Sequence, residues 1–273
     1  MTPRVLIIIP AYNERDTIAS VIADLREYAP DYDVLVVDDG SLDDTANIVR
    51  RQRDVALIQL PYNLGIGSTM QTGYLDAVRE GYDIAVQCDA DGQHPAHQVG
   101  RIVERVTDGT ADLVIGSRYV VETDYVPSLS RRVGKSLLSR LVNSAIGGGI
   151  TDTTSGFRAM NRAVLSVFAQ YYPDDYPEAE ALVFVYRHGL RAAEVPVDMR
   201  PRQGGQTSIS PRKAAYYIVK VSLAIFIGLF KKIMDTPSGL DQIEEAIESA
   251  ESGREQAEAV ENNDTVDEWK RTA

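Results

Sequence analysis

Short apolar runs, rich in β-branched residues, recur along residues 1–117 and alternate with segments whose apolar positions repeat every three or four residues. Such runs are typical of strands that are buried on both faces of a parallel sheet. The segments between them have the spacing of amphipathic helices, most clearly at Ile18, Val21, Ile22 and Leu25. The pattern therefore predicts an α/β fold, a mostly parallel sheet flanked by helices. The predicted strands are Val5–Ile9, Val34–Val37, Val55–Leu60, Ile84–Gln87 and Leu113–Ile115.

The alternation weakens after residue 118, although two helices and one strand are still indicated. An amphipathic helix is expected at Arg131–Ile146, where three glycines follow it, and another at Glu178–His188. Thr151–Ala159 is interpreted as irregular structure or strand, and Ala192–Val197 as a strand. Ser41 is predicted to be the N-cap of a helix, because acidic residues follow it closely.

The longest apolar stretch is Ala214–Phe230, interrupted by Lys220 and followed by two lysines. As a helix it would span about 25 Å, less than the ~30 Å hydrocarbon core of a bilayer. We interpret residues 211–234 as a membrane-associated helix that lies on the membrane surface. A tilted span and a helix packed on its own domain remain open alternatives.

Composition and charge narrow the classes of protein. The chain has 273 residues, of which 44% are apolar and 25% charged, enough to bury a sizeable core. One cysteine, Cys88, excludes a disulfide framework and is typical of a reducing compartment. The formal charge of −12 argues against a nucleic-acid-binding protein, and the 12 acidic and 3 basic residues of segment 235–273 make it an acidic tail, helical or disordered. The apolar run near the amino terminus is shorter than a secretory signal requires, so export is not expected.

Two pairs of acidic residues follow predicted strands: Asp38 and Asp39 in VVDDGS, and Asp89 and Asp91 in DADGQH. In open α/β sheets, ligands bind at the carboxyl ends of strands, so both pairs are expected in one crevice. Paired carboxylates suit Mg²⁺ or Mn²⁺, which usually keep water ligands and share the phosphates of a substrate. Gln93 or His94 could add a ligand or a contact that supports one, whereas the alternative is a solvated turn.

Two common nucleotide-binding motifs are absent from the sequence. The first predicted strand ends in PAYNE, without the G-x-G-x-x-G of a dinucleotide-binding fold, and the chain has no Walker phosphate loop. NAD and ATP chemistry are therefore disfavoured.

In order and spacing, the motifs PAYNE, VVDDGSLDDT, NLGIGSTMQTGY, DADGQHP and GSRY resemble those of the family 2 glycosyltransferases, which have the GT-A fold. Within that family the chain is most similar to polyprenyl-phosphate sugar synthases, of the dolichyl-phosphate mannose or glucose synthase type. DTTSGFRAMNR and RPRQGGQTSI extend the likeness to about residue 232. The resemblance implies that residues 1–117 are the nucleotide-sugar-binding half of a GT-A domain and residues 118–210 its acceptor-binding half.

The resemblance also assigns roles to individual residues. Nucleotide-sugar binding is implied for Pro10, Ala11, Tyr12, Glu14, Asp39, Asp89 and Ala90, with Asp38 as a support. Asp89, Asp91 and Gln93 match the metal ligands, so Asp91 counts among the catalytic residues. Arg118 and Arg202 match phosphate contacts, with a surface ion pair as the alternative for each.

The acceptor decides whether a catalytic base is needed. The family inverts at the anomeric carbon, so a hydroxyl acceptor needs a carboxylate base, for which Glu180 is the first candidate and Glu178 the second. Acids also favour a first helical turn for electrostatic reasons alone. A phosphate acceptor is already an anion near neutrality and needs cations instead. Arg132 and Arg158 are candidates for that contact, or they belong to a solvated helix face.

These observations predict an inverting, Mg²⁺- or Mn²⁺-dependent transferase that moves a hexose from a UDP- or GDP-sugar to polyprenyl phosphate. Transfer to a hydroxyl of a glycan or lipid-linked saccharide is one alternative, and a non-catalytic sugar-nucleotide-binding subunit is another. We expect a cytoplasmic protein held peripherally at the inner face of the cell membrane. Because the chain has only one long apolar segment, it could need a small membrane-protein partner or a homo-oligomer for stable anchoring.

Overall fold

A seven-stranded sheet forms the centre of the computed structural model, which describes residues 2–118, 139–140, 142–144, 146–174, 177–200 and 223. The strand order is β3-β2-β1-β4-β6-β5-β7, and only β6 runs antiparallel to its neighbours. The strands are β1 (Val5–Ala11), β2 (Asp33–Asp38), β3 (Ala56–Gln59), β4 (Ile84–Gln87), β5 (Leu113–Ser117), β6 (Arg158–Asn161) and β7 (Ala192–Pro196).

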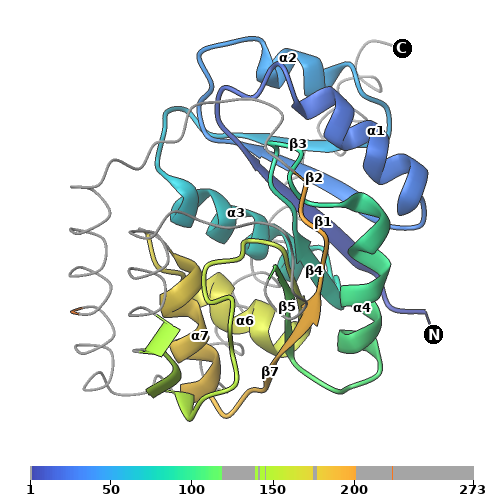
Figure 1. Cartoon of the computed structure of the whole chain (residues 1–273). Coiled ribbons are helices and arrows are strands. Elements are labelled where there is room, and N and C mark those ends of the chain that lie inside the picture. Colours follow the sequence, from blue (N-terminus) through green and yellow to red (C-terminus); the bar gives the residue numbers. More distant parts are fainter. Residues whose placement is uncertain are drawn as a thin grey trace, which may run out of the picture. The chain divides into compact units, whose positions relative to one another are not determined.

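Helices cover both faces of this sheet (Figure 1). Side chains of β1 alternate between two cores: Leu6 and Ile8 contribute to one, and Ile7 and Ile9 to the other. The first core includes α3 (Ile66–Arg79), α6 (Arg162–Gln170) and α7 (Pro177–Arg187). The second includes α1 (Ile18–Tyr28), α2 (Thr45–Arg50), the 3₁₀ turn η1 (Ala96–Gln98) and α4 (Val99–Thr107). Burial on both faces explains why the strands are continuously apolar.

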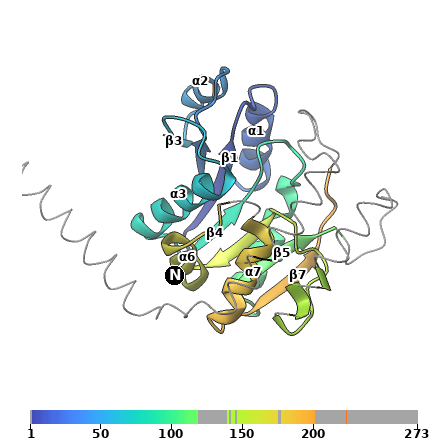
Figure 2. The ribbon, with the colours of Figure 1, turned by 90° about the vertical axis from the view of Figure 1, so that its left-hand side faces the viewer.

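The antiparallel strand β6 lies between β4 and β5, as Figure 2 shows from the side. Arg158, the first residue of β6, is paired with Gln87 of β4 and with Ile115 of β5. Strand β4 ends at Gln87 and β5 ends two residues after Ile115, so β6 begins at the edge where they finish. The preceding segment, residues 151–157, is therefore brought to the carboxyl edge of the sheet.

The predicted α/β fold and its mostly parallel sheet are confirmed. Each of the five predicted early strands is present, and the helix expected at Glu178–His188 is α7. Of the helix expected at Arg131–Ile146, residues 139–140, 142–144 and 146 are described and are helical. Strand β6 overlaps the end of Thr151–Ala159, the segment that the sequence predicts to be either irregular structure or strand.

The prediction for Ser41 is wrong. Helix α2 begins only at Thr45, and the Ser41 hydroxyl accepts a hydrogen bond from the backbone N–H of Asn13 at 2.9 Å. Ser41 therefore connects two loops instead of capping a helix.

Several predictions concern residues outside the described part of the chain. They include Arg132, Arg202, the apolar segment 214–230 except Leu223, and the acidic tail 235–273. Within the described residues, no helix is both long enough and apolar enough to cross a bilayer.

Candidate active site

The carboxyl ends of β1 and β2 lie side by side and are joined by a backbone bond. Ala11 is paired with Asp38, and the N–H of Asp39 donates to the carbonyl oxygen of Ala11 at 2.8 Å. Pro10 and Ala11 are buried within β1, whereas the next residue, Tyr12, is 42% exposed. Of these three residues predicted to hold the nucleobase and ribose, Tyr12 is the one with an exposed side chain.

The loop after β1 is tied to the loop after β2. Asn13 adopts a positive φ of 56°, and its side-chain oxygen accepts from the N–H of Leu42 at 2.8 Å. The N–H of Glu14 donates to the Thr45 hydroxyl, and the Glu14 carboxylate accepts from the Thr17 hydroxyl at 2.8 Å. These bonds hold the two loops together as one rim of the carboxyl edge.

Asp39 holds the backbone that follows β3. Its two carboxylate oxygens accept from the N–H groups of Leu64 at 2.7 Å and Gly65 at 3.0 Å. Gly65 has a φ of 91°, which a residue with a side chain rarely adopts, so the turn requires glycine here. A carboxylate oxygen can accept a second hydrogen bond, so the predicted contact of Asp39 with a nucleotide is compatible with this arrangement.

Asp38 is fully buried and makes fewer contacts. One carboxylate oxygen accepts from the N–H of Ser41 at 3.2 Å, while the other has no hydrogen-bond partner in the part of the chain that the structure describes. Both aspartates therefore support loops, whereas the sequence predicted this only for Asp38.

Asp89 and Asp91 follow directly on β4 and differ in exposure. The Asp89 side chain is 37% exposed, whereas Asp91 is 4% exposed. An Asp91 carboxylate oxygen accepts from the N–H of Gln93 at 3.0 Å, which closes a tight turn directly after buried Ala90. The Gln93 carbonyl in turn accepts from the N–H of Arg200 at 2.9 Å. The predicted metal ligands thus share one short loop at the carboxyl edge.

The donor atoms of this loop fit a hard divalent cation. Two carboxylates and a carboxamide offer oxygen ligands, as Mg²⁺ and Mn²⁺ prefer. Over the described ranges, no group of three or more His, Cys, Asp and Glu side chains is arranged to hold a metal. A site of few protein ligands is the arrangement expected for a cation that also binds water and substrate phosphates.

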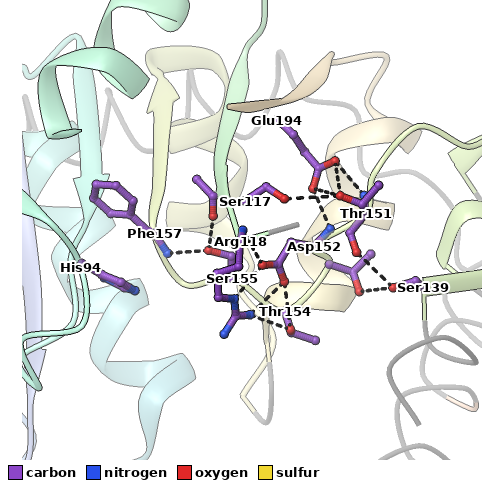
Figure 3. Close-up of polar contacts among 12 residues, drawn as sticks. His94, Ser117, Arg118, Ser139, Thr151, Asp152, Thr154, Ser155, Phe157 and Glu194 are labelled. Carbon is purple, nitrogen blue, oxygen red and sulfur yellow. Dashed lines mark hydrogen bonds and ion pairs between the residues drawn. The ribbon is translucent and has the colours of Figure 1, made fainter. Parts of the chain in front are cut away.

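Arg118, at the end of β5, is held by a buried carboxylate (Figure 3). Its Nε and Nη2 atoms donate to the two oxygens of Asp152 at 2.8 and 2.9 Å, and Nη2 also reaches the Thr154 hydroxyl at 3.2 Å. Glu194 of β7 accepts from the N–H groups of Thr151 at 2.8 Å and Asp152 at 2.6 Å. This network orients a half-exposed guanidinium at the same edge as the aspartates, and the contact with a phosphate stays a prediction.

Arg158 is fully buried, which the sequence did not indicate. Its Nε donates to the carbonyl of Ser155 at 2.7 Å, and its Nη2 donates to the carbonyls of Glu178 at 2.8 Å and Thr153 at 3.4 Å. It therefore joins segment 151–157 to the first turn of α7. This position argues against direct contact of Arg158 with a phosphate group and for a role in positioning the loop and the helix.

The two candidate bases lie in the first turn of α7. Residues two apart on a helix project in nearly opposite directions, so Glu178 and Glu180 serve different surroundings. Burial raises the pKa of Glu178, and the Arg158 guanidinium opposes this rise; Asp89 and Arg118 also contribute to the field at Glu178. Glu180 acts on Tyr171, whose pKa is raised by burial and then by Glu180. The field of Asp89 thus reaches Glu178, the second of the two candidate bases in the sequence analysis.

We predict that Glu178→Gln stabilises the protein at pH 7 to 8 and has no effect near pH 4. The raised pKa means that the folded state disfavours the ionised form, so stability is lost as pH rises above the pKa of the unfolded state. Thermal unfolding between pH 4 and 8 measures this difference in melting temperature. Glu104→Gln, on the exposed face of α4, is the control and should show no such trend. A pH-independent effect of Glu178→Gln would contradict the assignment.

Asp89 has two further neighbours, of which the sequence indicated His94 as a possible supporting residue but gave no sign of Gly156. A Cβ added at Gly156 would lie 3.2 and 3.3 Å from the Asp89 carboxylate oxygens, so glycine lets the backbone approach them closely. The imidazole of His94 contacts Asp89 twice. Gly156 belongs to the motif SGFR and His94 to the motif DGQHP, and the fold brings these two motifs to the same carboxylate.

The sheet order, the antiparallel β6 and the aspartate pair after β4 define a glycosyltransferase of the GT-A type. The model of the family described as Glycosyl transferase family 2 matches residues 6–168, and the chain belongs to this family.

Comparison with known proteins supports the same assignment. The chain is 31% identical over 233 residues to polyprenol monophosphomannose synthase of Mycolicibacterium smegmatis, covering 81% of this chain and 86% of that protein. It is 33% identical over 234 residues to undecaprenyl-phosphate mannosyltransferase of Micrococcus luteus, covering 80% and 93%. Glucosyl-3-phosphoglycerate synthase of Mycobacterium tuberculosis, crystallised with Mn²⁺, UDP and phosphoglyceric acid, shares the fold with a TM-score of 0.63 at 20% identity, covering 82% and 79%.

Proposed function

We propose that this glycosyltransferase moves a hexose from a UDP- or GDP-sugar to a polyprenyl phosphate, with inversion at the anomeric carbon. The observation that carries the proposal is the half-exposed Asp89 beside the buried Asp91 at the end of β4. The acceptor class rests on the two mannosyltransferase relatives, whose names specify polyprenol and undecaprenyl phosphate and whose likeness covers at least 80% of this chain.

On the donor side, each group has a distinct task. Asp89 and Asp91, with Gln93, would hold Mg²⁺ or Mn²⁺, which when bound neutralises the negative charge that grows on the departing diphosphate. Tyr12 and Glu14, in the loop after β1, would contact the nucleoside together with Asp39. Arg118, fixed by Asp152, would contact a phosphate of donor or acceptor.

On the acceptor side, a phosphate needs positioning more than deprotonation. Its second pKa of about 6 makes it a dianion near neutrality, so it can attack the sugar without a protein base. Arg132 and Arg202 are the proposed cationic contacts. Glu178 and Glu180 would then shape the site, whereas a hydroxyl acceptor would require one of them as the base.

A polyprenyl acceptor also implies a place in the cell. We infer that the protein works at the inner face of the cell membrane, held peripherally by the segment 211–234. A small membrane-protein partner or a homo-oligomer could complete the anchoring.

The test is a transfer assay with purified protein, Mn²⁺, a UDP- or GDP-hexose and undecaprenyl phosphate. We expect lipid-linked sugar with one donor, and we expect Glu178→Gln and Glu180→Gln each to retain turnover within about tenfold. Loss of a catalytic base costs about 10²- to 10⁴-fold. A loss of that size with a saccharide acceptor, and no transfer to the lipid phosphate, would establish the hydroxyl alternative. Nucleotide binding without transfer to any acceptor would instead identify a non-catalytic subunit.

A further inference from the structure

His94 lies in the loop after β4 and is almost completely withdrawn from solvent, with 5% of its side chain exposed. Its Nδ1 atom lies 2.8 Å from the backbone nitrogen of Asp89. Since a backbone N–H can only donate, Nδ1 is the acceptor. The neutral ring therefore carries its hydrogen on Nε2.

The other ring nitrogen lies near the same aspartate. The Nε2 atom lies 3.5 Å from Oδ2 of Asp89, a longer contact than a normal hydrogen bond. One imidazole thus contacts both the backbone and the carboxylate of Asp89. The two contacts restrict the backbone and the side chain of Asp89 together.

Segment 151–157 completes the surroundings of Asp89. The ring of Phe157 packs against the His94 ring with 5.0 Å between centroids and 30° between planes, and Figure 3 shows the two side chains next to each other. Gly156, which belongs to the same segment, brings its backbone close to the Asp89 carboxylate. The carboxylate therefore lies between His94 and Gly156, while 37% of the Asp89 side chain stays exposed.

We infer that His94 is a positioning residue that fixes the Asp89 carboxylate in the orientation needed to bind a divalent cation. The inference rests on the proposed function, because it takes Asp89 as a ligand. Groups that orient a metal ligand commonly change metal affinity by 10- to 100-fold when they are lost. The absence of His94 should therefore weaken cation binding without abolishing it.

Two substitutions separate the contacts of the imidazole. His94→Asn keeps an acceptor near the position of Nδ1 and loses Nε2, whereas His94→Gln places its amide near Nε2 and leaves the Asp89 N–H unpaired. His97→Asn is the matched control, since His97 is exposed on η1 nearby. Binding of Mn²⁺ is measured by electron paramagnetic resonance, with UDP and separately with GDP, and transfer is measured at saturating Mn²⁺.

We expect the dissociation constant for Mn²⁺ to rise about tenfold in both His94 variants and to stay unchanged in His97→Asn. Turnover at saturating Mn²⁺ should remain within about threefold of the wild type. A general loss of stability would lower turnover as well as Mn²⁺ affinity, so it would not produce this combination. Unchanged Mn²⁺ affinity in folded His94 variants would overturn the inference.

Gly156→Ala tests the same carboxylate without altering the imidazole. The added Cβ would lie 3.1 Å from Nε2 of Gln87 and 3.2 and 3.3 Å from the two oxygens of Asp89, so these groups must shift and the Mn²⁺ dissociation constant should again rise. If the His94 variants do not fold, unchanged affinity in Gly156→Ala overturns the inference. Failure of the proposed function gives a different result. In that case the wild-type protein either does not bind Mn²⁺ or binds it as well as Asp89→Asn does.

Discussion

Sugar transfer by the double variant Asp89→Asn, Asp91→Asn is expected to fall by about a thousandfold or more. A metal that stabilises a leaving group supplies several kcal/mol, and each 1.36 kcal/mol is about tenfold in rate. Asparagine keeps the size of each side chain but removes the charge that holds the cation. The measurement is the initial rate of transfer to undecaprenyl phosphate over a range of Mn²⁺ concentrations.

Asp83→Asn is the control for this experiment, because Asp83 lies at the opposite edge of the sheet, just before β4 begins. It should leave the rate unchanged. The single variants should differ in one respect: Asp91 is nearly buried and bonds the N–H of Gln93, so Asp91→Asn should also lower the melting temperature slightly. Undiminished transfer by the folded double variant would refute the proposed metal site.

Arg158→Met is expected to lower the free energy of unfolding by about 3 kcal/mol, the low end of the cost of breaking a buried charged contact. Three backbone carbonyls lose a charged donor, and two of those bonds are 2.7 and 2.8 Å long. For a domain of this size, the melting temperature should fall by about 10 °C. Thermal unfolding followed by circular dichroism measures the change.

The matched control is Arg105→Met, because Arg105 is exposed on α4 and its ion pair with Asp108 is long, at 3.9 Å. Its effect should be within about 0.5 kcal/mol. The prediction separates two roles of Arg158. If the melting temperature is unchanged and the KM for undecaprenyl phosphate rises, Arg158 contacts the acceptor phosphate. The interpretation of Arg158 as a residue that positions the loop and the helix would then be wrong.

The strands could be predicted well because burial on both faces leaves a simple signal in the sequence. The short apolar runs at Val5–Ile9 and Ile84–Gln87 predict strands, and they form β1 and β4. The order of the strands could not be derived from such runs. Strand β6 has only four residues and begins with an arginine, so its pattern resembles a loop.

The candidate site was only partly predictable, for a related reason. A motif shows which side chains are near one another in sequence, such as Asp89 and Asp91. It does not show whether a polar group faces solvent or another part of the chain. The sequence assigns both Arg158 and Asp39 to ligands, but Asp39 accepts from the backbone N–H of Leu64 and Arg158 donates to the backbone carbonyl of Glu178. Likewise, the sequence suggested His94 as a supporting residue without showing which aspartate it contacts.

The position of β6 has a consequence for biosynthesis. Strand β5 is hydrogen-bonded to β6 and β7 and not to β4, so both of its partners leave the ribosome after it does. Until residue 161 has been synthesised, β4 and β5 expose unpaired backbone edges that could template aggregation. The amino-terminal 117 residues, although they contain every aspartate of the proposed metal site, therefore depend on downstream sequence to close their sheet.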